Sequence, residues 1–175
     1  MKNIHYLLFA LSMILMGSCS HKYDSNTLGL DFYQWNLWQD TGPVQGDHLP
    51  SCGWEDLHRG KGKLVRIPAS LEEHFTVFES SDVFWYHCRF TLPEQWQGKT
   101  ISMIFTQAGP FVEVFLNENH AGSFQDEEGT FDLDVSEVIY YTRDNHLSIR
   151  ISGAGSGSAM QPAGISGTIL VKSGT

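Results

Sequence analysis

The sequence has few basic residues and lacks several motifs that define enzyme families. Its 175 residues include 11 Lys and Arg against 20 Asp and Glu, a formal net charge of −9 at pH 7. So acidic a chain has no electrostatic attraction to nucleic acid or to anionic lipid, and no nucleic-acid partner is expected. The chain also has no Gly-x-Ser-x-Gly elbow and no Gly-x-Gly-x-x-Gly loop. These absences argue against an esterase-type nucleophile and against a cradled phosphate.

The sequence has one long apolar run, and this run is too short to cross a bilayer. Residues 4–16 are mostly apolar, follow a positive Lys2 and end before Gly17-Ser18-Cys19. The pattern resembles a bacterial lipoprotein signal. It implies that residues 1–18 are a signal peptide, that Cys19 carries a lipid anchor, and that the protein lies in the cell envelope, on the periplasmic or the outer side. An ordinary secretory signal or an uncleaved anchor is the alternative, and each takes the protein out of the cytoplasm.

Cysteine is scarce, and Cys52 and Cys88 remain once Cys19 is assigned to the lipid. An exported protein can form disulfides, but the sequence does not bring the Cα atoms of this pair within bonding distance. Cys88 alternates with polar residues on the apolar side of a predicted strand, which is typical of a small buried hydrophobic residue. We therefore favour two unpaired thiols and expect no catalytic cysteine.

Apolar and polar residues alternate through much of the remaining chain. In residues 84–92 one face carries Phe84, Tyr86, Cys88, Phe90 and Leu92. The pattern recurs in residues 101–105 and 112–116, which predicts three consecutive strands of one antiparallel sheet. A looser alternation in residues 31–38 predicts a first strand.

Other segments predict loops, and no long helix is predicted. Residues 41–59 have no periodicity and are rich in Gly, Pro, Asp and His, which is typical of a long surface loop. Residues 64–68 predict a short strand ended by proline, and residues 69–81 an irregular crossover. About eight strands with turns between them predict an all-β fold, a two-sheet antiparallel β-sandwich of the jelly-roll kind. We assign residues 19–27 to a polar tether and residues 28–175 to one domain.

A series of short motifs runs through these predicted strands. They are Trp85-Tyr86, Thr91-Leu92-Pro93, Trp96-Gln97-Gly98-Lys99, VEVFLNENHAG at 112–122, FDLDVS at 131–136, NHLSIRI at 145–151 and GISGTI at 164–169. Their order resembles the sugar-binding domain of glycoside hydrolase family 2, over residues 30–171. The resemblance implies a galactose-binding-like jelly roll. In the family's first strand a tryptophan packs inward, so the resemblance also implies that Trp35 and Leu37 lie in the core. One departure is the hairpin turn, because the family's Asn-Gly is Asn117-Glu118 here.

The resemblance also implies that the chain is not an enzyme. Family 2 carries its catalytic carboxyl groups in a separate downstream barrel, and the sequence given ends at Thr175, just beyond the last predicted strand. A glycosidase needs two carboxyl groups about 5 to 10 Å apart across the scissile bond. The acidic residues at 126–128 fall in a predicted turn, and Asp132 and Asp134 fall on an outward strand face. We predict that all of them are solvated surface charges.

A carbohydrate site needs an exposed aromatic ring beside polar side chains. Trp38 and Trp54 are the predicted sugar-contacting aromatics, because neither falls on a recognisable core face. Trp35 and Trp96 are predicted to pack, and Trp85 fits either role. The resemblance places a further loop at residues 153–164, where Gln161 is the one good hydrogen-bonding side chain.

No cofactor is predicted. His48, Cys52, Asp56 and His58 are close in sequence and of metal-binding types, but their spacing matches no common zinc site. A structural calcium ion is compatible with the many carboxylates, yet no residue set can be assigned to it.

Three hypotheses for function stay open. The first, which we favour, is a non-catalytic carbohydrate-binding lipoprotein. The second is a structural or protein-docking sandwich, for which a contiguous apolar surface patch would be the sign. The third is a remnant or subunit of a longer family 2 glycosidase, with a separate partner glycosidase. Because fold resemblance alone does not transfer function, the site must decide among them.

Overall fold

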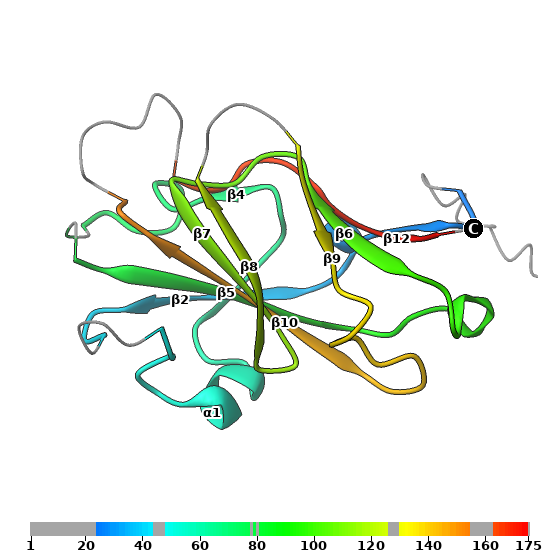
Figure 1. Ribbon diagram of the computed structural model, residues 1–175. Coiled ribbons are helices and arrows are strands. Elements are labelled where there is room, and N and C mark those ends of the chain that lie inside the picture. Colours follow the sequence, from blue (N-terminus) through cyan, green and yellow to red (C-terminus); the bar gives the residue numbers. More distant parts are fainter. Residues whose placement is uncertain are drawn as a thin grey trace, which may run out of the picture.

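The computed structural model describes residues 24–43, 48–77, 79, 81–125, 130–154 and 163–174. These residues form two main antiparallel sheets packed face to face, with a small third sheet at one end (Figure 1). The prediction of an all-β, two-sheet antiparallel sandwich is confirmed. The predicted signal peptide, Cys19, the turn at 126–128 and Gln161 lie outside the described residues. Among those that are described, no helix is both long and apolar enough to span a membrane.

Every strand pair in the described chain is antiparallel. The four-stranded sheet has the order β1 (Thr27–Gly29), β12 (Ile169–Ser173), β6 (Ile101–Phe105) and β9 (Phe131–Asp134). The six-stranded sheet has the order β3 (Lys63–Val65), β2 (Trp35–Asp40), β5 (Val83–Phe90), β10 (Asn145–Ser152), β7 (Phe111–Leu116) and β8 (Asn119–Gln125). The small sheet joins β4 (Ala69–Ser70) to β11 (Gly164–Ile165). The helical elements are α1 (Trp54–His58) and two 3₁₀ turns, η1 (Leu30–Phe32) and η2 (Glu94–Trp96).

One predicted feature of the sheets is wrong. The three segments expected to be consecutive strands of one sheet are β5, β6 and β7, and β6 belongs to the other sheet. Both β5 and β7 pair with β10, which comes much later in the chain. Alternation shows that a strand has one buried face. Because strands of both packed sheets bury one face against the same core, alternation does not show to which sheet a strand belongs.

The main core lies between the two large sheets. Trp35 and Leu37 are fully buried there, as predicted, and so is Cys88. Trp96 is buried as well, and its indole Nε1 donates to the Ser25 carbonyl at 3.1 Å. Cys52 and Cys88 are both free thiols, which confirms the prediction of no bridge between them.

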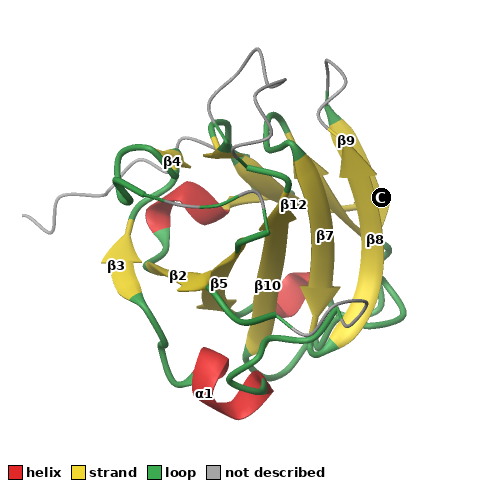
Figure 2. Cartoon of the chain, turned by 90° about the vertical axis from the view of Figure 1, so that its left-hand side faces the viewer, coloured by secondary structure: helices red, strands yellow, loops and turns green. Residues whose placement is uncertain are grey.

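A second, smaller cluster lies on the opposite face of the six-stranded sheet, where α1 covers it (Figures 1 and 2). It consists of Leu57, Val83, Trp85 and Phe115, with Trp38, Cys52 and Trp54 partly buried against it. Residues 54–58 therefore form a helix inside the segment predicted to be a surface loop. The helix begins after Gly53, whose φ is +79°, and a helix of five residues is too short for its periodicity to appear in the sequence.

The β7–β8 hairpin places two non-glycine residues in the left-handed region, Asn117 at φ +53° and Glu118 at φ +69°. This is the conformation of a two-residue hairpin turn that favours Asn-Gly. Because glycine adopts it without strain, we expect Glu118→Gly to raise the free energy of unfolding by about 0.5–1 kcal/mol. Urea denaturation measures the change. Glu118→Ala, which removes the carboxylate but keeps a Cβ, is the control, and an equal gain there would contradict the backbone explanation.

Candidate functional site

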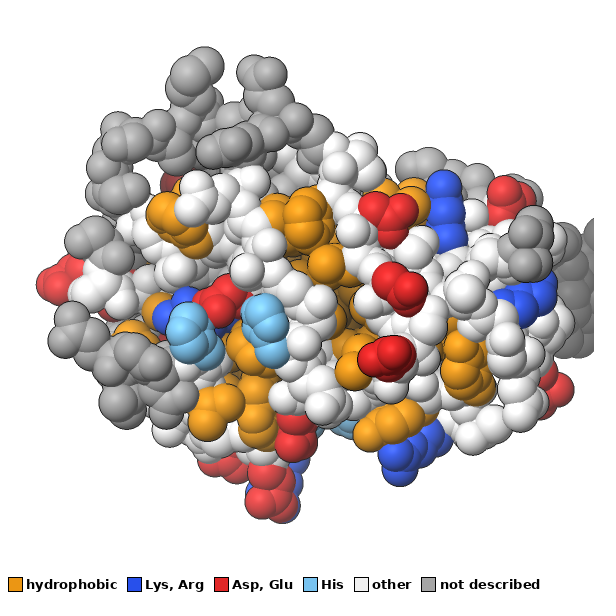
Figure 3. All heavy atoms as spheres, viewed as in Figure 1, with side chains coloured by type: hydrophobic (Ala, Val, Ile, Leu, Met, Phe, Trp, Pro, Cys, Tyr) orange, Lys and Arg blue, Asp and Glu red, His pale blue; other side chains and the backbone are white. Residues whose placement is uncertain are grey.

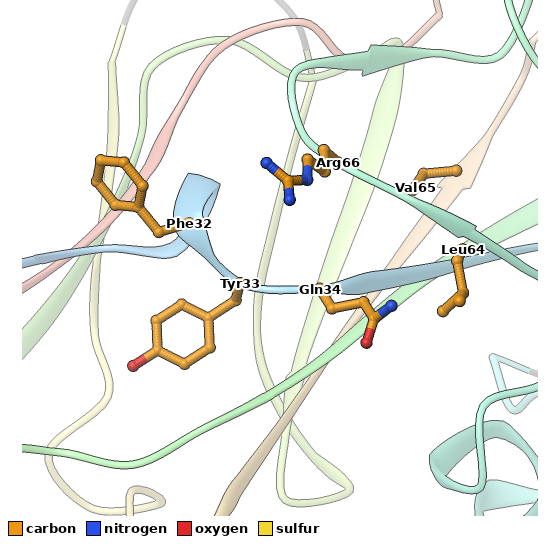
Figure 4. A pocket seen from close by; sticks show the side chains of 6 residues that line it. All are labelled: Phe32, Tyr33, Gln34, Leu64, Val65 and Arg66. Atoms are coloured by element: carbon orange, nitrogen blue, oxygen red, sulfur yellow. The ribbon is translucent and has the colours of Figure 1, made fainter.

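Two neighbouring hollows lie at the β3–β2 side of the six-stranded sheet. The edge hollow has a volume of about 480 Å³ and is lined by Phe32, Tyr33, Gln34, Leu64, Val65 and Arg66 (Figure 4). The histidine hollow has a volume of about 550 Å³ and is lined by Tyr33, Gln34, Asn36, His58, Arg59, Gly60, His87, Cys88 and Arg89. Tyr33 and Gln34 line both, so the two hollows meet at the start of β2.

The edge hollow combines exposed apolar surface with polar side chains. Phe32 is 65% exposed and Leu64 is 63% exposed, while Gln34 and Arg66 are also exposed. Figure 4 shows the Arg66 side chain extending toward the turn that carries Phe32 and Tyr33. Among the described residues, Arg66 has no acidic partner, unlike Arg59, which pairs with Glu55 at 2.5 Å. The hollow therefore offers one exposed aromatic ring, one amide and one unpaired guanidinium.

Local structure explains why these side chains meet. The 3₁₀ turn η1 ends at Phe32, and the backbone then extends through Tyr33 into β2. Strand β3 pairs with β2 in the register Trp35 with Val65 and Asn36 with Leu64, which turns Val65 inward and Leu64 outward. Since β3 is an edge strand of three residues, its neighbour Arg66 stays free to reach across the turn.

The histidine cluster is defined as His58, His87 and His146, of which His58 and His87 line the histidine hollow. Its members come from α1, β5 and β10 respectively. The rings of His58 and His146 stack with centroids 4.3 Å apart, and those of His58 and His87 with centroids 5.0 Å apart. The His87 Nε2 and His146 Nδ1 atoms are 3.2 Å apart, within hydrogen-bond distance.

The surroundings of the cluster lower the pKa of all three rings and so favour their neutral forms. Burial, with the neighbouring His58, lowers the pKa of His87 from 6.5 to about 3. Burial, with the nearby His146, lowers the pKa of His58 to about 4. The pKa of His146 is also lowered, mainly by burial. In each ring the protonated form is disfavoured because its charge would lose solvation, and a neighbouring imidazole adds to this at His58 and His87, whereas the Arg89 guanidinium adds to it at His146.

Several buried polar atoms near the cluster have no hydrogen-bond partner within the described part of the chain. They are His58 Nε2, His87 Nδ1, Trp85 Nε1 and Ser148 Oγ. Ser148 lies directly opposite His87 in the β5–β10 register. Because a buried polar group without a partner is costly, this concentration of them marks a place that needs a functional or structural explanation.

The two predicted tryptophans lie on this side of the sheet but belong to the second cluster. Trp38 is half-buried, opposite Trp85 in the sheet, with the Lys61 ammonium 5.4 Å from its ring centroid. Trp54 is half-buried and meets Trp85 edge-on at a centroid distance of 5.6 Å. Both help to pack α1 on the sheet. Whether they contact sugar stays a prediction.

The other predicted residues are placed as follows. Trp85, which the sequence left ambiguous, is fully buried. Asp132 and Asp134 are exposed, as predicted for surface charges. The only metal-type group among the described residues contains His58 but none of its predicted companions. His48 instead contacts Glu113, with Nδ1 and Oε1 2.5 Å apart.

Sequence reasoning missed Phe32, Gln34 and Arg66, and also His87 and His146. The histidines occupy outward positions of alternating strands, which the pattern does indicate. The two histidines become neighbours because β5 pairs with β10, and a single sequence does not reveal such a long-range pairing.

Comparisons with known proteins agree with the fold. No protein-family model matches the chain, and no curated protein matches it. Among solved structures, a glycosyl hydrolase family 2 member from Bacteroides cellulosilyticus matches with a TM-score of 0.66 and 16% identity, over 85% of this chain and 20% of that chain. The β-glucuronidases from Ruminococcus gnavus and Lactobacillus rhamnosus each match with a TM-score of 0.63 and 17% identity, over 86% of this chain.

The chain covers only 30% of the Ruminococcus enzyme and 29% of the Lactobacillus enzyme. It is therefore similar to one part of these glycosidases. At identities this low the likeness concerns the fold: the chain has the β-sandwich architecture of a domain found within family 2 glycosidases.

Proposed function

We propose that this protein is a non-catalytic carbohydrate-binding domain and that the edge hollow is its sugar site. The observation that carries the proposal is Phe32, an exposed aromatic ring beside Gln34 and Arg66 in one hollow. Sugar rings present C–H patches that pack on aromatic faces, and their hydroxyl groups need directional polar partners. The amide of Gln34 supplies a donor and an acceptor, and the guanidinium of Arg66 supplies donors.

The positive charge of Arg66 in the edge hollow indicates which class of sugar fits best. Arg66 has no acidic partner among the described residues, in a chain of formal net charge −9. A planar guanidinium binds carboxylate or sulfate with two parallel hydrogen bonds. An acidic glycan, one with uronic acid or sulfate groups, therefore fits this hollow better than a neutral one.

The proposal includes export and a lipid anchor on Cys19. The anchor rests on the sequence pattern alone. A domain held to a membrane in this way would present its sugar site to glycans of the cell envelope or of the surroundings. It would need no catalytic residue to retain them.

Binding is expected to depend on Phe32 and Arg66. The full-length chain, purified in mild detergent, is screened on a glycan array that carries acidic and neutral glycans, and hits are measured by calorimetry. Phe32→Ala and Arg66→Ala should each weaken binding roughly tenfold, about 1.4 kcal/mol, because each removes one main contact. Phe111→Ala is the matched control, since Phe111 is 44% exposed but lines neither hollow.

The variants Trp38→Ala and Trp54→Ala test the site predicted from the sequence. If they abolish binding and Phe32→Ala does not, the sugar lies over the second cluster and the edge hollow is the wrong site. If the folded protein binds no glycan, the proposal fails in favour of a docking domain or a subunit of a glycosidase. In the view of Figure 3, hydrophobic side chains form separate patches divided by polar and acidic ones, rather than the contiguous apolar patch expected of a docking face.

A further inference from the structure

The histidine cluster shares no residue with the edge hollow and has the composition of a metal site. One ring nitrogen from each of His58, His87 and His146 lies within 4.8 Å of the other two. We propose that these three side chains bind a transition-metal ion of the Zn²⁺ class, which fastens α1 to the six-stranded sheet.

The spacing of the ring nitrogens suits such an ion. Tetrahedral zinc with Zn–N bonds of about 2.0–2.1 Å holds its nitrogens about 3.4 Å apart. His87 Nε2 and His146 Nδ1 are already 3.2 Å apart. His58 stands at the end of a five-residue helix with its ring stacked on that of His146, and one of its ring nitrogens lies within 4.8 Å of the nitrogens of the other two rings. Binding of an ion therefore requires this one side chain to move closer to them.

The unpartnered atoms support the same conclusion. His87 is only 3% exposed, and within the described chain neither its Nδ1 nor His58 Nε2 has a hydrogen-bond partner. An ion held by His87 Nε2 and His146 Nδ1 would give His58 Nε2 the partner that it lacks, while His87 Nδ1 would be left for an outer hydrogen-bond partner. Ser148 lies opposite His87 in the register and its hydroxyl is equally unpartnered, so the neighbouring strand offers a hydroxyl group for that outer role.

The three imidazole ligands indicate which metal ions would bind. Three imidazoles and no carboxylate suit Zn²⁺, Cu²⁺, Ni²⁺ or Co²⁺, whereas Ca²⁺ and Mg²⁺ prefer oxygen ligands. Three protein ligands leave one coordination position for water or another small ligand. Both His58 and His87 border the histidine hollow, so that position is reached from solvent.

The test uses the full-length protein in mild detergent, prepared without a histidine tag and freed of metal with a chelator. Calorimetric titration with Zn²⁺ alone should show one site per chain, and saturating Zn²⁺ should raise Tm by about 5–10 °C. Co²⁺ in place of Zn²⁺ should give the visible absorption of a four-coordinate site. His146→Ala and His58→Ala should weaken binding at least about 100-fold, since losing even an outer partner of a ligand costs roughly 10–100-fold.

The control is His74→Ala, which removes a histidine that lies outside the cluster, on the connection between β4 and β5. It should bind Zn²⁺ as the parent does. His146→Gln is a second ligand variant: it removes the imidazole but keeps most of the side-chain volume, so it is expected to fold even if His146→Ala does not. The proposal is overturned if the folded parent binds no Zn²⁺, or if His146→Gln and His58→Ala bind it as tightly as His74→Ala.

Discussion

Gly164→Ala is expected to lower the free energy of unfolding by about 3–5 kcal/mol, a large part of the stability of a domain this size. Gly164 has a φ of +124°, a conformation that residues with a Cβ rarely adopt. A Cβ built there would lie 2.7 Å from both the Ala69 carbonyl oxygen and the Tyr86 hydroxyl oxygen. The Tyr86 hydroxyl donates to that same carbonyl at 2.8 Å, so neither group is free to move away.

Urea denaturation of the parent and variant measures this loss. Gly98→Ala is the matched control, because Gly98 has a φ of +77° but a Cβ there would meet nothing within 4 Å. It should cost only about 1–2 kcal/mol, the strain of the left-handed backbone by itself. Equal losses in the two variants would show that crowding around Gly164 contributes nothing.

Asn145→Ala is expected to cost about 2–4 kcal/mol, because it breaks a buried polar network. Asn145 is fully buried, accepts from the Tyr140 backbone N–H at 2.8 Å and donates to the Tyr140 carbonyl at 2.8 Å. It also accepts from the Asn117 side-chain amide at 2.9 Å. Alanine would leave the Tyr140 N–H and carbonyl groups without these partners and would remove the Asn145 amide from a fully buried position.

Thermal unfolding should show a fall in Tm of about 5–15 °C for this variant. Asn119→Ala is the control: Asn119 is exposed, its amide donates to the Asn117 carbonyl at 2.8 Å, and its loss should cost less than about 1 kcal/mol. Because Asn117 and Asn145 share one hydrogen bond, the double variant should lose less than the sum of the two single losses. Strict additivity would contradict a shared network.

The pattern of alternation predicted much of the architecture. It placed Cys88 in the core because the neighbours of Cys88 alternate with it on an outward face, and the family resemblance added Trp35 and Leu37. It assigned β6 to the wrong sheet because both sheets bury one face in the same way. It missed α1, whose five residues are held by Leu57 packing on Trp85 rather than by any helical periodicity.

The sites were harder to predict than the fold. Phe32 lies in a 3₁₀ turn of three residues, where no periodicity assigns it to a face, and its exposure appears only in three dimensions. His87 and His146 are 59 positions apart and become neighbours through the β5–β10 pairing. Trp38 and Trp54 appeared free because the sequence did not reveal a second cluster outside the main core.

The pairing of β1 with β12 has a consequence for how this domain can be connected to other chains. Thr27 lies opposite Lys172, so the polypeptide enters and leaves the sandwich side by side at one edge of the four-stranded sheet. A domain with adjacent ends can be inserted into a loop of another protein, or circularly permuted through a short linker, without breaking a sheet. The β-sandwich can therefore be joined to or inserted into another chain as an intact unit.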